Sequence, residues 1–322
     1  MDNTRLRRYI WGIVKIIVLA GIIFFLSRSL FTNWERIAGY SWDIRPLPLA
    51  ISFIFLILFY LASFLLWENL CKGMGVKIPP FTNMAIWFYS QAGKYLPGKI
   101  WGPMGRIYLV ERHGMRRIDA GICLAYEAAY TTLGGGIIAL ITVPFWANSS
   151  GSYSLRWFLL GIPGVIVVMH PRMMGWFINR ALRIFKINSV NITFSGFFLF
   201  RLLLVSLLLW VLGGIGFFFF VDSILPTDGA MVITHGGIFA ASCMLGILAF
   251  MTPSGLGVRE GAFVLLLQPL MPSEVAVMVA FGARFWMICV EVIGIGIGGA
   301  MVSLYGKRLR GSGRVSNIGS RN

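Results

Sequence analysis

Long apolar runs are the feature that most constrains the fold of this chain. They approach the ~20 residues that an α-helix needs to cross a bilayer core of ~30 Å, and they recur along the whole 322-residue sequence. Only 12% of the residues are charged, whereas soluble domains carry about 25%, and the mean hydropathy is +0.79. The short alternating segments of a membrane β-barrel are not seen. The sequence therefore predicts an all-α polytopic membrane protein.

We expect about eight transmembrane helices plus a re-entrant element and broken helices. The expected crossings are residues 9–31, 46–67, 119–145, 155–170, 196–221, 231–251, 256–271 and 274–305. Basic residues alternate with apolar ones in 171–195, which predicts an amphipathic helix on the cytoplasmic surface. Residues 1–310 should form a single integral membrane domain, and 311–322 a polar, disordered cytoplasmic tail.

The net charge of +16 indicates which side of the membrane the loops occupy. Basic residues gather on the loops between alternate crossings, and the positive-inside rule then places both termini in the cytoplasm of a bacterial inner membrane. The N-terminal run, preceded by Arg5, Arg7 and Arg8, is interpreted as an uncleaved anchor. This charge favours contact with anionic lipids and no nucleic acid. The four cysteines and three histidines lack metal-ligand spacing, so we expect no metal and no cofactor.

Two stretches with broken helical character interrupt the apolar pattern. In the first, residues 93–106, glycines and prolines accompany Lys94, Lys99 and Arg106. The apolar part before it is too short to cross, and the charge rule places both flanks in the cytoplasm, so 80–106 should be re-entrant or lie at the interface. In the second, residues 252–261, Pro253 and three glycines precede and surround the pair Arg259–Glu260.

We hypothesise that the two stretches meet and form one polar site for an anionic headgroup, most simply a phosphate. A helix that restarts at the second stretch would offer free N–H groups and a positive dipole end beside Arg259. Charged residues inside the membrane are costly and need a reason. The expected substrate-binding residues are Lys94, Lys99, Arg106, Glu127, Arg259, Glu260 and Arg284. No catalytic residue is expected.

Structural explanations stand beside this hypothesis. Arg259–Glu260 could be a structural pair, the two lysines could touch lipid phosphates at the surface, and Glu127 could pair with a basic residue. Glu291, two turns from Arg284, could be only its partner, and Arg201 is expected to reach the interface. The glycine-rich run 294–299 predicts close helix packing.

The second stretch resembles a known signature. Residues 253–261, Pro-Ser-Gly-Leu-Gly-Val-Arg-Glu-Gly, are similar to the signature of the lysylphosphatidylglycerol synthase transmembrane (flippase-like) family, with Ser254 in place of a glycine. Residues 93–106 resemble an earlier element of that family, and Glu127 and Arg284 fall at its acidic and basic positions. A second acidic residue that is common in the family is Thr131 here. The soluble aminoacyl-transferase domain is absent, so the resemblance describes a stand-alone member.

The resemblance implies movement of a lipid between leaflets rather than catalysis. The cargo would carry an anionic or lipid-linked headgroup: a polyprenyl-phosphate sugar, a glycolipid or a phospholipid. One alternative is a non-transporting membrane partner or scaffold of a glycosyltransferase or other envelope-lipid enzyme. Another is a membrane enzyme acting on a lipid-linked sugar, although no Asp-x-Asp motif or histidine cluster supports it. No nucleotide-binding loop is seen, so any driving force would be a gradient, a potential or downhill flow.

Overall fold

The computed structural model describes residues 43–95, 100–146, 194–249, 255 and 257–311. The expected crossings 9–31 and 155–170, the expected surface helix 171–195 and most of the expected tail lie outside these residues. Every described element is helical: α3 (Pro46–Gly73), α4 (Pro80–Ser90), η1 (Gln91–Tyr95), α5 (Trp101–Glu111), α6 (Arg117–Trp146), α10 (Gly196–Ile224), η3 (Gly229–Met231), α11 (Val232–Leu248), α12 (Val258–Leu267) and α13 (Ser273–Gly311).

Five helical segments in this part of the chain are long and apolar enough to cross a membrane. They are Pro46–Gly73, Arg117–Trp146, Gly196–Ile224, Gly229–Leu248 and Ser273–Leu304. Each coincides with an expected crossing, which confirms a multi-pass helical membrane protein. The short helices α4, α5 and α12 have 11, 11 and 10 residues. At 1.5 Å per residue each is about 16 Å long, roughly half of a bilayer core.

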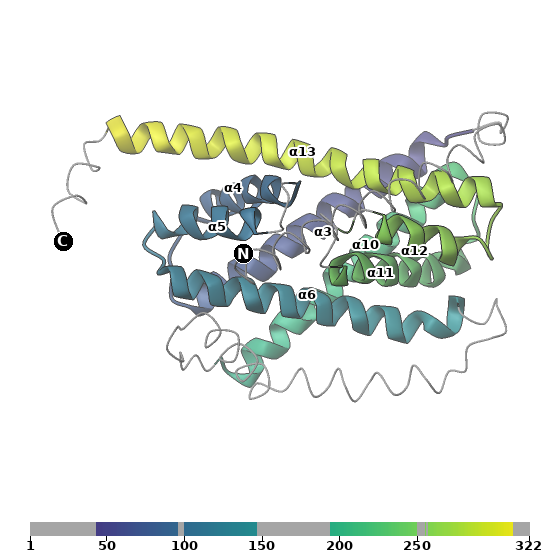
Figure 1. Ribbon diagram of the computed structural model, residues 1–322, viewed down its shortest axis with the longest axis horizontal. Coiled ribbons are helices and arrows are strands. Elements are labelled where there is room, and N and C mark those ends of the chain that lie inside the picture. Colours follow the sequence, from purple (N-terminus) through teal and green to yellow (C-terminus); the bar gives the residue numbers. More distant parts are fainter. Residues whose placement is uncertain (1–42, 96–99, 147–193, 250–254, 256, 312–322) are drawn as a thin grey trace, which may run out of the picture.

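The long helices surround the short ones. In Figure 1, α13 runs along the upper edge of the molecule and α6 runs across its lower part, with α3 between them, while α10 starts below α6 and passes obliquely across it. The pair α4 and α5 lies near one end of the bundle, and α11 and α12 lie near the other. The core between them is built from large aromatic side chains, including Phe59, Trp210, Phe217, Phe239 and Trp286.

Glycines let the central helices approach closely. A Cβ atom at Gly213 of α10 would lie 2.8 Å from Phe59 of α3 and 2.7 Å from Phe239 of α11, so only a glycine fits between these rings. The backbones of α10 and α11 touch where the two helices cross. A Cβ at Gly214 would lie only 2.8 Å from the Cα of Gly236. Such small-residue crossings are typical of packing between membrane helices.

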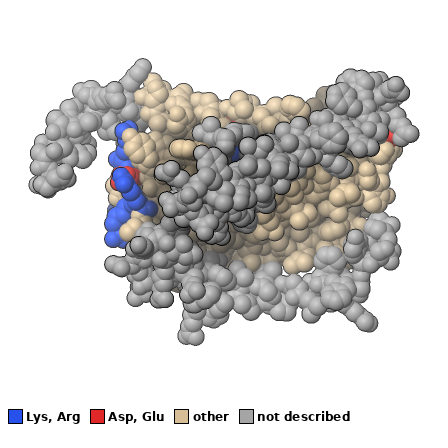
Figure 2. Space-filling model, viewed as in Figure 1, with Lys and Arg blue, Asp and Glu red and all other residues tan. Residues whose placement is uncertain are grey.

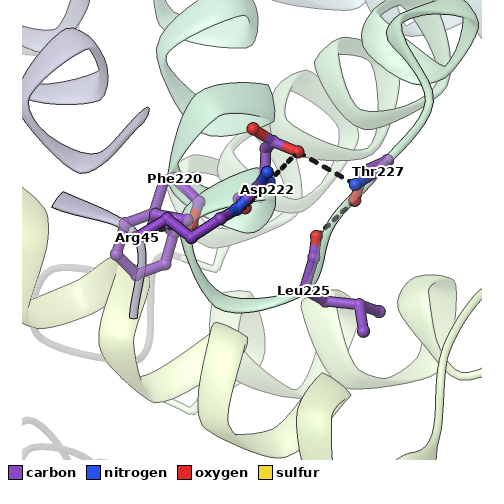
Figure 3. Close-up of polar contacts among 6 residues, drawn as sticks. Arg45, Phe220, Asp222, Leu225 and Thr227 are labelled. Atoms are coloured by element: carbon purple, nitrogen blue, oxygen red, sulfur yellow. Dashed lines mark hydrogen bonds and ion pairs between the residues drawn. The ribbon is translucent and has the colours of Figure 1, made fainter. Parts of the chain in front are cut away.

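The α3–α10 pair is joined at one end by Arg45. Its side chain forms an ion pair with Asp222, and its Nε donates to the Asp222 carbonyl oxygen at 3.1 Å. Figure 3 shows the Asp222 carboxylate between Arg45 and the backbone N–H of Thr227, which donates to it at 2.9 Å. The Thr227 hydroxyl in turn donates to the Leu225 carbonyl oxygen at 2.7 Å. This network fixes the start of α3 against the turn that follows α10.

Helices α4 and α5 form a hairpin whose two arms touch through their backbones. A Cβ at Gly93 would lie 2.2 Å from the backbone nitrogen of Gly102, so the two arms are in direct contact there. Asn83 attaches the hairpin to α3: its side-chain oxygen accepts from Trp67 Nε1 at 2.9 Å and its amide donates to Glu68 at 2.5 Å. The hairpin is thus held by buried polar contacts as well as by apolar packing.

Helix α13 packs on α4 through the glycine-rich run. A Cβ at Gly294 would lie 2.3 Å from the Phe88 ring, and one at Gly298 would lie 2.7 Å from the Ala85 carbonyl oxygen. Gly296 faces the other way and has open space. The packing role predicted for residues 294–299 is therefore confirmed for Gly294 and Gly298.

Basic side chains gather at the end of the molecule where α5 joins α6. Arg112, Arg116 and Arg117 are exposed there, and Figure 2 shows a cluster of Lys and Arg atoms at that end. Two of these arginines pair with carboxylates, Arg116 with Asp119 at 2.7 Å and Arg117 with Glu111 at 2.7 Å. The arginine side chains are exposed, and water screens the attraction within such pairs, so the cluster marks one face of the bundle rather than holding it together.

Candidate functional site: a charged cluster between two broken stretches

The second broken stretch bends sharply before α12. Gly255 and Gly257 have φ angles of +69° and +82°, which residues with a side chain rarely adopt. Gly255 also lies against α11, since a Cβ there would lie 2.6 Å from the Gly246 carbonyl oxygen. Pro253 and Ser254 lie outside the described residues. Gly255 and Gly257 are thus required by the backbone.

Glu260 caps the helix that follows this bend. The Gly257 N–H donates to Glu260 Oε2 at 2.6 Å, which satisfies a backbone donor at the start of α12 and places a negative charge at the positive end of the helix dipole. The other oxygen, Oε1, has no hydrogen-bond partner in the part of the chain that the structure describes. Glu260 therefore caps α12 through Oε2, and Oε1 is left without a hydrogen bond.

That second oxygen faces two arginines. Arg259 Nη2 lies 3.7 Å from Glu260 Oε1, and Arg284 Nη1 of α13 lies 3.6 Å from it. The side chains of Arg259 and Arg284 are only 12% and 13% exposed. The distances exceed those of a charge-assisted hydrogen bond, which are about 2.7–2.9 Å. The two guanidinium groups thus share one carboxylate without closing on it.

Within the described residues, the other polar partners of the Arg259 guanidinium are sulfur atoms. Its Nη1 donates to Met287 Sδ at 3.4 Å, and Cys243 of α11 lies beside it. Thioether and thiol sulfurs are weak acceptors. A nearly buried guanidinium with such partners retains much of its capacity to bind an anion.

The first broken stretch reaches the same place through Lys94. Lys94 Nζ, in η1, lies 2.5 Å from Glu291 Oε1 of α13, and the Tyr60 hydroxyl of α3 donates to that same oxygen. Lys94 is within electrostatic range of Arg259 and Arg284, and Arg259 is within range of Glu291 and Tyr60.

We call these five charged residues the central cluster: Lys94, Arg259, Glu260, Arg284 and Glu291. They come from η1, α12 and α13, so residues of both broken stretches lie together in the structure. Glu260 and Glu291 are 2% and 5% exposed, and desolvated charges interact more strongly than charges in water. The arrangement is suited to holding an anion inside the bundle.

Arg106 and Glu127 form a separate ion pair, with Arg106 Nη1 at 2.5 Å from Glu127 Oε2. Arg106 Nε also donates to Ser90 Oγ at 2.9 Å, and Trp87 Nε1 donates to Glu127 Oε1 at 2.8 Å. The guanidinium carbon lies 4.8 Å from the centroid of the Trp67 ring, in cation–π geometry. These contacts tie α5 to α3, α4 and α6.

The structure places four of the seven residues expected to bind substrate in the central cluster and two in a separate ion pair. Lys94, Arg259 and Arg284 are the cations of the central cluster, and Glu260 lies between the two arginines. Arg106 and Glu127 neutralise each other, in line with the structural explanation for Glu127. Lys99 lies outside the described residues.

Two contributors to this site were not among the expected residues. Glu291 contacts Lys94 and Tyr60, so it is not a partner of Arg284 alone. Tyr60 sits in the uninterrupted apolar run of α3, and no local pattern distinguishes it.

Arg201 has an exposed side chain, and its Nη2 donates to Asn69 at 2.6 Å near one end of α10. Within the described residues, no group of His, Cys, Asp and Glu side chains could hold a metal ion.

The family model described as "Lysylphosphatidylglycerol synthase TM region" matches residues 12–294. The matched range includes η1, α12 and the part of α13 that carries Arg284 and Glu291. No curated protein matches the chain.

Proposed function

The chain belongs to the lysylphosphatidylglycerol synthase TM region family, and from this premise we propose that it is a lipid translocase. It would move a lipid with an anionic or lipid-linked headgroup across the cytoplasmic membrane. A polyprenyl-phosphate sugar and a phospholipid carry the phosphate chemistry that the central cluster suits, and a glycolipid fits it where its headgroup is anionic. Binding and passage of the headgroup are proposed, and no covalent step.

The observation that carries this proposal is the position of three cations on interrupted helices. Lys94 lies in η1 and Arg259 at the start of α12, while Arg284 of α13 faces the same carboxylate as Arg259. A phosphate needs such groups to leave water, because transfer of a charge into hydrocarbon is very costly. Half-length helices that end near mid-depth are also how many transporters build their binding sites.

The contacts divide the residues into two roles. We propose that Lys94, Arg259 and Arg284 touch the headgroup. Glu260 positions the two arginines through its free oxygen and holds α12 through its bonded one. Arg106 and Glu127 position the α4–α5 hairpin, because each already has the other as its partner. Lys99, which lies outside the described residues, stays a prediction from the sequence.

The placement in the membrane follows from the same features. We propose that the α4–α5 hairpin is re-entrant from the cytoplasmic side, since neither arm is long enough to cross. The basic end at Arg112, Arg116 and Arg117 then faces the cytoplasm. We further propose eight crossings, in which residues 256–271 count as one broken crossing built from the bend and α12, with both termini in the cytoplasm of the inner membrane.

Reconstitution tests the proposed activity directly. The full chain in proteoliposomes should speed the loss of fluorescence of a headgroup-labelled lipid when an impermeant quencher is added outside, relative to protein-free vesicles. A covalently altered lipid in the same sample, seen by mass spectrometry, would instead indicate an enzyme. If neither signal is seen, the remaining function is that of a non-transporting scaffold of a glycosyltransferase or other envelope-lipid enzyme. Lipids that co-purify with the protein identify the cargo.

Arg259→Ala is the decisive variant. It removes a cation that is 12% exposed, and we expect the translocation rate to fall by about tenfold or more, since each tenfold corresponds to 1.36 kcal/mol of lost transition-state stabilisation. Arg201→Ala is the matched control, because Arg201 is exposed and contacts Asn69 rather than the central cluster. An Arg259→Ala variant that translocates lipid at the rate of the unmodified chain would contradict the proposal.

A further inference from the structure

Glu291 contributes to the net charge of the central cluster. Among the described residues the cluster contains three cations, Lys94, Arg259 and Arg284, and two carboxylates, Glu260 and Glu291. With every group ionised, the charges sum to one positive charge. Glu291 is 5% exposed and lies 2.5 Å from Lys94, so its charge acts in a largely desolvated place.

A buried site favours a ligand that makes the total charge zero, because an uncompensated charge in a low-dielectric interior is costly. One negative charge on the headgroup achieves this in the central cluster. A second negative charge on the same phosphate would face Glu260 and Glu291 without a further cation from this cluster. Like charges brought together at a binding site suppress the wrong partner.

We propose that Glu291 is a specificity-determining residue that limits the headgroup to a single negative charge. This inference rests on the proposed function and identifies the electrostatic class of its cargo. A phosphodiester, in which the phosphate is esterified on both sides, meets the requirement. A phosphomonoester is excluded in its doubly charged form. Glu291 acts by occupying Lys94, with Tyr60 holding the carboxylate in place through its hydroxyl.

The structure also explains why Glu291 rather than Glu260 has this role. Glu260 Oε2 accepts the Gly257 N–H at the start of α12, so its loss would disturb the helix that carries Arg259. Glu291 lies inside the continuous helix α13, where it caps nothing. Its contacts in the cluster include a lysine side chain and a tyrosine hydroxyl. Its charge can therefore be removed with less effect on the backbone.

Two lipids that differ by one methyl group provide the probe. Phosphatidic acid and phosphatidylmethanol with identical acyl chains carry a phosphomonoester and a phosphodiester, respectively. At pH 8 the monoester is doubly charged, because its second pKa is about 6, whereas the diester keeps one charge. The full chain in detergent is incubated with equal amounts of both lipids, and native mass spectrometry gives the ratio that remains bound.

The expected results follow from the charge sum. The unmodified chain should retain more phosphatidylmethanol, and Glu291→Gln, which leaves two positive charges, should shift the ratio towards phosphatidic acid by about tenfold. The double variant Lys94→Gln with Glu291→Gln returns the sum to one and should restore the original preference. Glu111→Gln is the matched control, since Glu111 pairs with Arg117 at the basic end and should leave the ratio unchanged.

Other outcomes overturn the inference. An unchanged ratio in Glu291→Gln would show that this carboxylate does not select the charge, and so would a double variant that behaves like the single one. If Glu291→Gln does not fold, Lys94→Gln carries the test: its charge sum is zero, and it should bind both lipids about tenfold more weakly. Wild-type binding by Lys94→Gln contradicts the proposal. The proposed function is judged separately, by translocation in proteoliposomes.

Discussion

The partners of a charged side chain decide whether its charge stabilises the fold or is available to a ligand. Arg106 has Glu127, Ser90 and the Trp67 ring as partners. Arg259 has a carboxylate at 3.7 Å and a thioether. Both are nearly buried arginines, so burial alone does not separate them. The quality of the acceptors does, because a good acceptor set uses the donors of a guanidinium and a poor one leaves them available.

This difference predicts a large loss of stability when Arg106 is replaced and a small one when an arginine at the basic end is replaced. Arg106→Met leaves Glu127 buried without its charge partner and should destabilise the protein by about 3–5 kcal/mol, which thermal unfolding in detergent would show as a clear fall in Tm. Arg117→Met breaks the exposed pair with Glu111, which water screens, and should leave Tm nearly unchanged. Equal Tm values for the two variants would mean that the Arg106–Glu127 pair does not hold the hairpin.

The sequence predicted most charged residues of the site but not their pairing. Lys94, Arg259, Glu260 and Arg284 were recognised because charges are rare in apolar segments. Glu291 was interpreted through its spacing from Arg284, since positions seven apart share a helix face. Its contact with Lys94 depends on how η1 packs against α13, and no local pattern encodes that. Tyr60 could not be predicted, because its only distinguishing feature is the hydroxyl that reaches Glu291.

At the scale of elements, glycine positions determine how the short helices fit among the long ones. Gly255 combines a φ of +69° with a backbone contact to Gly246. Gly298 lies against the Ala85 carbonyl oxygen of α4. In each case a methyl group would meet backbone atoms, which cannot rotate away as a side chain can.

The bend before α12 should therefore tolerate no side chain at Gly255. Gly255→Ala must strain the backbone or push α12 from α11, and left-handed backbone costs a non-glycine residue roughly 1–2 kcal/mol before any clash. We expect a lower Tm together with slower translocation, because Arg259 follows the bend. Gly261→Ala is the control: Gly261 lies inside α12 with open space, and alanine there should be neutral or stabilising by up to about 1 kcal/mol. Similar losses in both variants would contradict the role assigned to the bend.

The glycine-rich run of α13 offers a second matched comparison. Gly298→Ala should separate α13 from α4 and lower Tm, since overpacking typically costs about 1–3 kcal/mol. Gly296→Ala, two residues earlier on the open face, should leave Tm unchanged or raise it. A reversed order of the two Tm values would mean that α4 does not pack where the structure places it.

Element positions were easier to predict than element roles. The five long helices were predicted because ~20 apolar residues have few alternatives to a crossing. For 80–106, charge and length predicted a segment that does not cross, and the structure shows two short helices in contact at Gly93 and Gly102. The contact itself could not be predicted, because glycine in a sequence indicates freedom of the backbone without naming its neighbour.

At the scale of the whole molecule, the two ends of the bundle differ in charge. Arg112 lies at the basic end between α5 and α6, whereas Asp228 lies next to η3, in the connection from α10 to α11. If the bundle spans the membrane as proposed, these residues face opposite compartments.

Labelling with an impermeant maleimide tests this orientation. In a chain whose Cys289 is replaced by serine, Arg112→Cys should react only after the cytoplasmic face is opened, and Asp228→Cys should react in intact cells. The native Cys71, Cys123 and Cys243 are buried and provide the background signal. Reaction of both introduced cysteines from the same side would exclude the proposed topology.

The crossing of α10 and α11 has a further consequence for motion. Gly214 and Gly236 meet backbone to backbone there, and the rings of Phe217 and Phe239 pack against each other beside this point. Interlocked side chains of this kind limit the rotation of one packed helix past another. Helices α10 and α11 should therefore move as one unit, to which the Arg45–Asp222 ion pair also fastens α3. A displacement of Arg259 relative to this unit would then have to come from the bend before α12.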